Sequence, residues 1–463
     1  MVGIPSPAAV LLPGFSGTEL PDWLRDRLAA GLAGVCLFGE NIEDAAQLRA
    51  LTDAIRAANP RAVIAIDEEG GDVTRLHYAS GSPYPGAAVL GRLDDTALTA
   101  RVARAVARDL VAAGVTLNLA PDADVNSNPG NPVIGVRSFG ADATLAARHV
   151  AAWTAAHEAE GVATSAKHFP GHGDVAVDSH LGLPVLDLDV EALRERELVP
   201  FRAAIAAGAS TVMTSHISLP RVDPTGPATF SAPVLEGLLR GELGFAGAIV
   251  SDALDMAGAS GGIGIPAAAV RALAAGVDLL CIGTRNTAEQ LDDIEAVIRA
   301  AVEGGALPIA RLAEAADRVA ALGSRPRPAS VDPVPLPDAA ELVRALDVAP
   351  GAHPPPGARI VQFETTASIA VGVVPWGPAA AGAPVTVVRP GDPLPDGPLV
   401  LVGRDNHRHE PVRAAIDAAR ASRPVLVVDM GWPSDDRRYA DVATFGASRA
   451  MGEALLSWLG AAR

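Results

Sequence analysis

In the stretch Ala62-Val63-Ile64-Ala65-Ile66-Asp67-Glu68-Glu69-Gly70-Gly71, a short apolar run ends directly in carboxylates and glycines. Comparable β-branched and leucine-rich runs recur along the chain and begin near Ala8, Gly34, Ala62, Val115, Gly161, Ser210, Gly247 and Gly276. An alanine-rich amphipathic stretch follows each run, and this alternation is typical of parallel strands joined by crossover helices. Eight such units over about 320 residues predict an α/β fold, a (β/α)8 TIM-like barrel with loop insertions.

The helical stretches support this interpretation. The clearest are Trp23–Ala30, Ala45–Ala58, Ala97–Ala113, Thr144–Glu160, Val190–Ala207 and Thr287–Glu303. A doubly wound open sheet is the competing architecture. No phosphate-binding GxGxxG follows the first strand, however, and the glycine cluster at Gly258–Gly264 lacks that spacing.

The amino-acid composition of the chain changes after Ala321. Residues 324–337 contain five prolines and predict a semi-rigid linker. Beyond it, apolar runs alternate with the helical stretches Val412–Ala421 and Ser448–Leu459. We therefore expect a barrel over residues 1–323, the Pro-rich linker over 324–337, and a smaller α/β layered domain over 338–463. The apolar runs of that domain are Ile360–Phe363, Val385–Val388, Leu399–Val402 and Val425–Val428.

Composition excludes several classes of partner. The 463 residues carry 37 Lys and Arg against 54 Asp and Glu, a net charge of −17, which argues against nucleic-acid and anionic-membrane binding. No apolar run reaches about 18 residues and no secretory signal is recognisable, so we expect a cytoplasmic protein. Cys36 and Cys281 lie inside apolar runs and are expected to be buried thiols. We expect no cofactor and no metal, and the oligomeric state stays open.

Ionisable residues follow five of the predicted strands. Because the carboxyl ends of barrel strands share one face, these residues are expected to form one site. The first cluster is Asp67, Glu68 and Glu69, and the next strand is followed by Asp122, Asp124 and a loop that ends at Arg137. The remaining members are Lys167 and His168, the nearby His172, Asp178 and His180, and then His216 and Asp252.

Each cluster also has a structural interpretation. Asp67 can cap a helix, and Glu68 and Glu69 are expected to be one solvent-facing and one structural carboxylate. His216 can be a hydrogen-bonded histidine, and Asp252 a structural carboxylate. A metal site of His168, His172, His180 and a carboxylate is a further alternative, although Pro170 and Gly171 prevent the helix that would align the first two imidazoles.

The combination favours displacement at a sugar carbon. A carboxylate held at a strand end can attack an anomeric carbon, while a second group protonates the departing oxygen. Lys167, Arg137, His168 and Asp67 would hold hydroxyls through charge-assisted hydrogen bonds. Aromatic residues make up only 4% of the chain, which favours a short pocket for one terminal sugar.

The motifs resemble glycoside hydrolase family 3, in its β-N-acetylglucosaminidase branch. They are Asp67–Gly71, Asn118–Pro121, Asn131–Gly140, KHFPGHGDVAVDSH (Lys167–His180) and IVSDALDM (Ile249–Met256). The resemblance implies that Asp252 is the covalent nucleophile and that Asp178 and His180 form a dyad, with His180 as general acid/base. It also implies sugar-binding roles for Asp67, Arg137, Lys167 and His168.

Two further positions are predicted to bind substrate, and two others depart from the family. Arg75 matches the second arginine of the first motif, and His216 follows a strand of the barrel. Relatives commonly carry glutamine at position 68 and arginine at position 72, where this chain has Glu68 and Asp72.

The expected activity is that of a retaining exo-β-N-acetylglucosaminidase acting on small saccharides such as cell-wall or chitin fragments. Ionised Asp178 would raise the pKa of His180 and make the imidazolium a proton donor. Once neutral, His180 would repel an attacking phosphate less than a carboxylate does, so a phosphorylase is the alternative. A catalytically silent sugar-binding protein is a third hypothesis. Glu364, in the predicted second domain, would be a poor substitute for His180 as the general acid/base.

Overall fold

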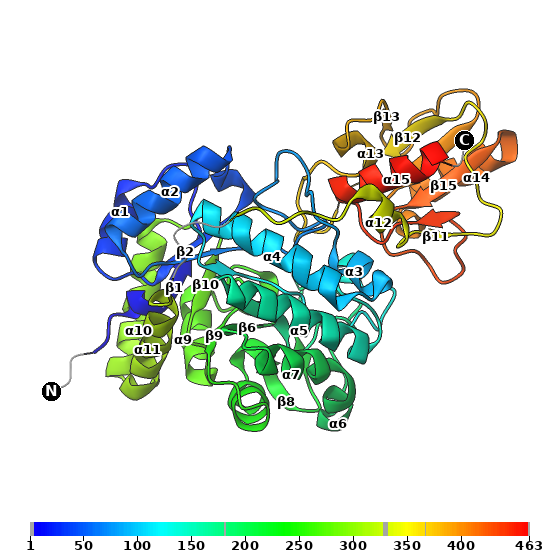
Figure 1. The fold of residues 1–463 in the computed structure, drawn as a ribbon. Helices are drawn as coiled ribbons and strands as arrows, with labels where there is room; N and C mark the ends of the chain where they lie inside the picture. Colours follow the sequence, from blue (N-terminus) through cyan, green and yellow to red (C-terminus); the bar gives the residue numbers. More distant parts are fainter. Residues whose placement is uncertain (1–3, 180–181, 327–331, 366, 462–463) are drawn as a thin grey trace.

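The computed structural model describes residues 4–179, 182–326, 332–365 and 367–461. Two α/β units lie side by side in Figure 1, a larger one in blue to green and a smaller one in yellow to red. Of the predicted site residues, His180 lies outside the described residues.

Eight parallel strands of the described chain form the ring of the larger unit. They are β1 (Leu11–Pro13), β2 (Gly34–Leu37), β3 (Val63–Ile66), β4 (Leu117–Asn118), β5 (Ala163–Phe169), β6 (Thr211–Thr214), β9 (Ala248–Val250) and β10 (Leu280–Gly283). Hydrogen-bonded ladders run β2-β3-β4-β5-β6-β9 and β1-β10. A parallel bridge between Val250 and Leu279 joins β9 to the β10 segment, and the Ala33 amide donates to the Ala8 carbonyl across the β1–β2 seam. The predicted (β/α)8 barrel is confirmed.

The first predicted strand begins later than expected. Residues Pro7–Val10, where we expected strand residues, form a 3-10 helix with Pro7 in its first turn, and the strand itself starts at Leu11. Proline has no amide hydrogen to donate to a strand ladder, which is why it is tolerated at a helix start.

The helices form the outer layer of the barrel (Figure 1). They are α1 (Asp22–Ala29), α2 (Ala45–Ala58), α3 (Ala87–Leu93), α4 (Thr96–Ala113), α5 (Ala143–Ala159), α6 (Val190–Ala192), α7 (Leu198–Ala206), α8 (Ala257–Ser260), α9 (Ile265–Ala275), α10 (Ala288–Glu303) and α11 (Ile309–Gly323). The side chains of Asp44, Asp95, Asp142 and Thr287 accept backbone amide hydrogen bonds and fix four of the starts. The stretch predicted as one helix over Val190–Ala207 contains a π-helical segment, Leu193–Glu197.

The smaller unit is a layered α/β domain, as predicted. Its sheet has the order β11-β16-β15-β14-β12-β13. The parallel strands are β16 (Val442–Ala443), β15 (Val425–Asp429), β14 (Leu399–Gly403), β12 (Arg359–Phe363) and, at one edge, β13 (Thr386–Val388). At the other edge, β11 (Asp347–Val348) pairs antiparallel with β16. Its helices are α12 (Ala339–Val343), α13 (Gly377–Ala380), α14 (Glu410–Ser422) and α15 (Arg449–Ala461). The linker over 324–337 stays a prediction.

The smaller domain packs against the barrel loops that follow β3 and β4. The Ala447 amide donates to Asp72 Oδ1 at 2.7 Å, and the Arg92 guanidinium donates to the Ala345 carbonyl at 2.9 Å. Val89, on barrel helix α3, is a member of the second domain's apolar core. The second domain is therefore a wall of the barrel's reactive face. Within the described residues, no helix has the length and apolar character needed to cross a bilayer.

Candidate active site

A cavity of about 270 Å³ lies at the carboxyl ends of the barrel strands. Residues that follow β3, β4, β5, β9 and β10 line it, and Ile369 and Ala370 of the second domain complete the wall. Phe38 is the one Phe, Tyr or Trp side chain among the described lining residues, in line with a short pocket rather than an extended stacking platform. The predicted site residues on its wall are Asp67, Arg75, Arg137, Lys167, His168 and Asp252.

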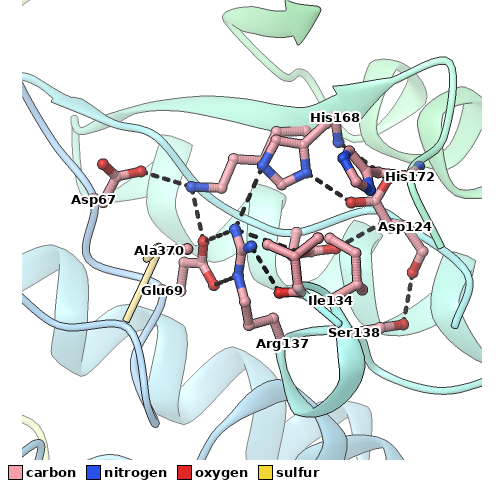
Figure 2. A network of polar contacts seen from close by, with 12 residues as sticks. Asp67, Glu69, Asp124, Ile134, Arg137, Ser138, His168, His172 and Ala370 are labelled. Carbon is pink, nitrogen blue, oxygen red and sulfur yellow. Dashed lines mark hydrogen bonds and ion pairs between the residues drawn. The ribbon is translucent and has the colours of Figure 1, made fainter. Parts of the chain in front are cut away.

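A buried network of charges forms one side of this cavity (Figure 2). The Lys167 ammonium donates to Asp67 Oδ1 at 2.6 Å and lies 2.8 Å from Glu69 Oε1. The Arg137 guanidinium donates to both oxygens of Glu69, at 3.0 and 2.7 Å. Burial alone would raise the pKa of Glu69, but Arg137 and Lys167 hold that pKa well below its ordinary value. Glu69 is therefore held as an ionised carboxylate between two cations.

The orientation of His168 is set by Asp124. His168 Nδ1 lies 2.7 Å from Asp124 Oδ2, and the amides of His168 and His172 donate to Asp124 Oδ1 at 3.2 and 2.7 Å. Burial opposes ionisation of Asp124, but the neighbouring His168 lowers its pKa. The imidazole thus turns Nδ1 to the Asp124 carboxylate, while Nε2 lies 3.4 Å from an Arg137 nitrogen.

Asp252 stands on another part of the same cavity. It follows β9, is half-buried, and its Oδ1 accepts the amide of Ala253 at 2.7 Å. Ser179 also lines the cavity, and its hydroxyl lies 3.1 Å from His172 Nε2. Asp178, the residue before Ser179, is buried. The structure thus brings the predicted nucleophile and the start of the predicted dyad segment to one cavity, whereas the Asp178–His180 pairing stays a prediction.

Two expectations need correction. His216 is fully buried and is absent from the described cavity wall; its Nδ1 lies 2.9 Å from Thr229 Oγ1 and its Nε2 lies 3.0 Å from the Ala253 carbonyl. It supports the segment beside Asp252 instead of contacting substrate. Glu69, like Glu68, is buried, so neither carboxylate faces solvent.

The substrate-binding role of Arg75 stays a prediction, and the charge of its side chain is directed at protein atoms. It lines the cavity, but its guanidinium donates to the Ala370 carbonyl at 2.8 Å and to the Val371 carbonyl at 3.4 Å. Both acceptors belong to the second domain, which sequence reasoning left without a role. Glu364 is also away from the cavity wall: its side chain is 62% exposed and pairs with Arg389.

Sequence reasoning missed the roles of Glu69 and Asp124. Both follow predicted strands, and that position was the available signal. Asp122, Asp124 and His168 offer possible metal-ligand atoms within 4.8 Å of one another. Two of these groups, His168 and Asp124, are already hydrogen-bonded to each other. Burial, together with the neighbouring Asp124, raises the pKa of Asp122. The Asp124 amide also donates to Asp122 Oδ1 at 2.9 Å, so we assign hydrogen bonding to this trio.

The two cysteines behave as predicted. Cys36 and Cys281 are both free and buried, and both line the base of the cavity. Contact with Cys36, together with burial, raises the pKa of Cys281 well above its ordinary value, as expected for an unreactive thiol.

Comparison with known proteins places these features in a family. The sequence profile of the glycosyl hydrolase family 3 N-terminal domain matches residues 18–322. Beta-hexosaminidase A of Pseudoalteromonas piscicida is 37% identical over 335 residues, which is 66% of this chain and 56% of that relative. The beta-hexosaminidase of Stenotrophomonas maltophilia (strain K279a) is 38% identical over 59% of this chain and 83% of its own length.

A solved structure extends the similarity over both domains. It is the glycoside hydrolase family 3 beta-N-acetylglucosaminidase from Paenibacillus sp. str. FPU-7, at 29% identity and a TM-score of 0.88, and the match covers 98% of this chain and 96% of that one. The protein belongs to glycosyl hydrolase family 3, a family of glycoside-hydrolysing enzymes, in its β-N-acetylglucosaminidase branch.

Proposed function

We propose that the protein is a retaining exo-β-N-acetylglucosaminidase that releases terminal N-acetylglucosamine from short β-linked saccharides such as cell-wall or chitin fragments. One observation carries this proposal: Asp252 shares a cavity of about 270 Å³ with the ionised network of Lys167, Glu69 and Arg137. A cavity of this size with charged groups on one side fits one sugar ring, and the similarity to named β-N-acetylglucosaminidases supports N-acetylglucosamine as that sugar. The cytoplasmic location stays a prediction.

The reaction begins with displacement at the anomeric carbon. An Asp252 oxygen forms a bond to that carbon as the glycosidic C–O bond breaks, and His180 gives its proton to the leaving oxygen. Neutral His180 then takes a proton from water, whose oxygen attacks the anomeric carbon and releases the Asp252 carboxylate. Two inversions at one carbon yield net retention of the β configuration.

We assign sugar binding to the residues of the charged network. Asp67 and His168 Nε2 accept hydrogen bonds from hydroxyls, whereas Lys167 and Arg137 donate. Since these groups are held by each other before substrate arrives, binding does not need to order them, and the free energy of their contacts goes to holding the ring.

The nucleophile is tested by replacing Asp252 with alanine. We expect the turnover of p-nitrophenyl β-N-acetylglucosaminide to fall by about 10³-fold or more, because no covalent intermediate forms. Added azide should restore nitrophenol release and give the α-glycosyl azide. Asp255→Asn is the matched control, since Asp255 lines the same cavity and should retain activity within about tenfold. Equal activity of Asp252→Ala and the unmodified enzyme would remove the assignment.

The proton donor is tested by changing the leaving group. His180→Gly should slow a natural disaccharide by about 10²-fold more than an aryl glycoside, because nitrophenolate departs without protonation. Equal losses on both substrates would argue against an acid role. Product analysis with and without phosphate, as free sugar or sugar 1-phosphate, separates hydrolysis from phosphorolysis.

A further inference from the structure

A second cavity, of about 240 Å³, adjoins the sugar cavity. The two cavities share Val133, Ile134 and Arg137 of the barrel, whereas Asp252 lines only the first. Barrel residues Asp72, Asn131, Pro132, Gly135 and Val136 also line the second cavity, and its other side comes from the second domain, at the carboxyl ends of β12, β14 and β15. The second-domain lining residues are Ala367, Ser368, Val371, Arg404, Asp405, Arg408, His409 and Gly431.

The segment of residues 367–373 separates the cavities, and we call it the partition. Ile369 and Ala370 line the first cavity, whereas Ala367, Ser368 and Val371 line the second. The backbone of the partition therefore passes between the two spaces, and Figure 2 shows Ala370 beside the charged network.

Two barrel side chains hold the partition in place. Arg75 donates to the carbonyls of Ala370 and Val371, at 2.8 and 3.4 Å, and the Tyr78 hydroxyl accepts the amide of Val373 at 3.2 Å. The turn that carries Arg75 is itself fixed, because Glu68 Oε2 accepts the amide of Arg75 at 2.8 Å. Arg75 is 8% exposed, so its hydrogen bonds are shielded from competing water.

From the order of the strands we infer which end of a bound sugar faces the partition. In the ring β1-β2-β3-β4-β5-β6-β9-β10, β3 stands opposite β9. A sugar whose anomeric carbon meets Asp252 after β9 therefore directs its far hydroxyls at Asp67 after β3 and at the Arg137 loop. The partition and the second cavity lie beyond these residues, on the side where a longer saccharide would continue.

We propose that the partition limits the pocket to one sugar, and that Arg75 and Tyr78 are positioning residues that set this limit. The proposal rests on the proposed function and adds the physical origin of its exo specificity. Releasing the partition would join the two cavities and make room for a second sugar at the non-reducing end. The second domain thereby becomes a specificity element of the barrel's reaction.

The test substrate is the p-nitrophenyl β-glycoside of the β-linked N-acetylglucosamine disaccharide. The unmodified enzyme should release only the monosaccharide in its first turnovers, leaving the nitrophenyl monosaccharide. Arg75→Ala should release the intact disaccharide together with nitrophenol in about a tenth or more of first turnovers. On the nitrophenyl monosaccharide, its KM should rise by about threefold to tenfold while kcat changes by less than about threefold.

Controls separate the partition from general loosening of the interface. Arg92→Ala also removes a barrel arginine that bonds a second-domain carbonyl, but Arg92 lines neither cavity, so monosaccharide release should stay exclusive. Tyr78→Phe keeps the ring and removes only the hydroxyl, and should give a smaller share of disaccharide. If Arg75→Ala does not fold, the products that Tyr78→Phe releases decide the test.

The outcomes are distinct. Exclusive monosaccharide release by both partition variants, or equal disaccharide release by Arg92→Ala, overturns the proposal. Absence of any turnover by the unmodified enzyme on either substrate refutes the proposed function instead.

Discussion

Replacing Glu68 by glutamine makes the cost of burying this carboxylate measurable. Glu68 is fully buried, and its Oε2 accepts the hydroxyl of Thr74 and the amides of Arg75 and Leu76 at 2.8–3.0 Å. Oε1 has no hydrogen-bond partner among the residues that the structure describes. Burial outweighs the three donors and raises the pKa of Glu68 from 4.5 to about 7.

The magnitude follows from the two pKa values. Because the folded protein holds this proton more tightly than the unfolded chain, stability is full below pH 4.5 and falls as the pH rises to about 7. At about 1.4 kcal/mol for each pH unit between these values, the loss is about 3 kcal/mol. Glutamine does not ionise, and part of the loss has occurred by pH 5, so the stability of Glu68→Gln relative to the unmodified protein should rise by about 2.5 kcal/mol between pH 5 and pH 8.

The assay is urea unfolding of both proteins at pH 5 and pH 8, followed by circular dichroism. Glu197 and Asp429 also have pKa values raised to about 7 by burial, but they are present in both proteins and cancel in the comparison. Glu364→Gln is the matched control, because that side chain is 62% exposed and its replacement should give the same difference at both pH values. A stability difference for Glu68→Gln that is independent of pH would refute the reasoning.

Three further predictions concern the sugar site. Lys167→Met should lower kcat/KM by about 10²-fold or more, as measured with the aryl glycoside, because it removes the cation that pairs Asp67 and Glu69. Asp124→Asn should lower kcat/KM by about tenfold while retaining the fold, since the neutral amide holds His168 Nδ1 less firmly; unchanged kinetics would contradict the orienting role. Exhaustive chelation should leave turnover unaltered, and its loss, restored by one added divalent ion, would instead support metal chemistry.

The sequence determined the barrel because its signals are local. An apolar run of five or so residues followed by an amphipathic helix is visible without knowing any distant contact, and eight repeats leave few architectures. The same logic predicted that Asp67, Lys167 and Asp252 would share a cavity, because the ends of parallel strands meet at one face. The start of the first strand was misplaced, since the apolar Ala8–Val10 suits a strand and a 3-10 turn equally.

The burial of individual polar side chains could not be predicted from the sequence. Glu68 and Glu69 are adjacent and chemically identical, yet one accepts backbone amides inside a turn and the other pairs with two cations. His216 likewise carries no local mark that it points beneath the cavity. Which neighbours surround a side chain depends on loops whose conformations are fixed by packing against other loops.

The contribution of the second domain to the cavity wall is visible only in the tertiary structure. Arg75 and the Ala370 carbonyl are 295 residues apart in the chain, and a backbone carbonyl carries no residue-type signature. The order of the motifs therefore determined the family, whereas the wall of the cavity was decided by how the sheets of the two domains come together. Contacts of that kind depend on the relative position of whole domains, which no short stretch of sequence encodes.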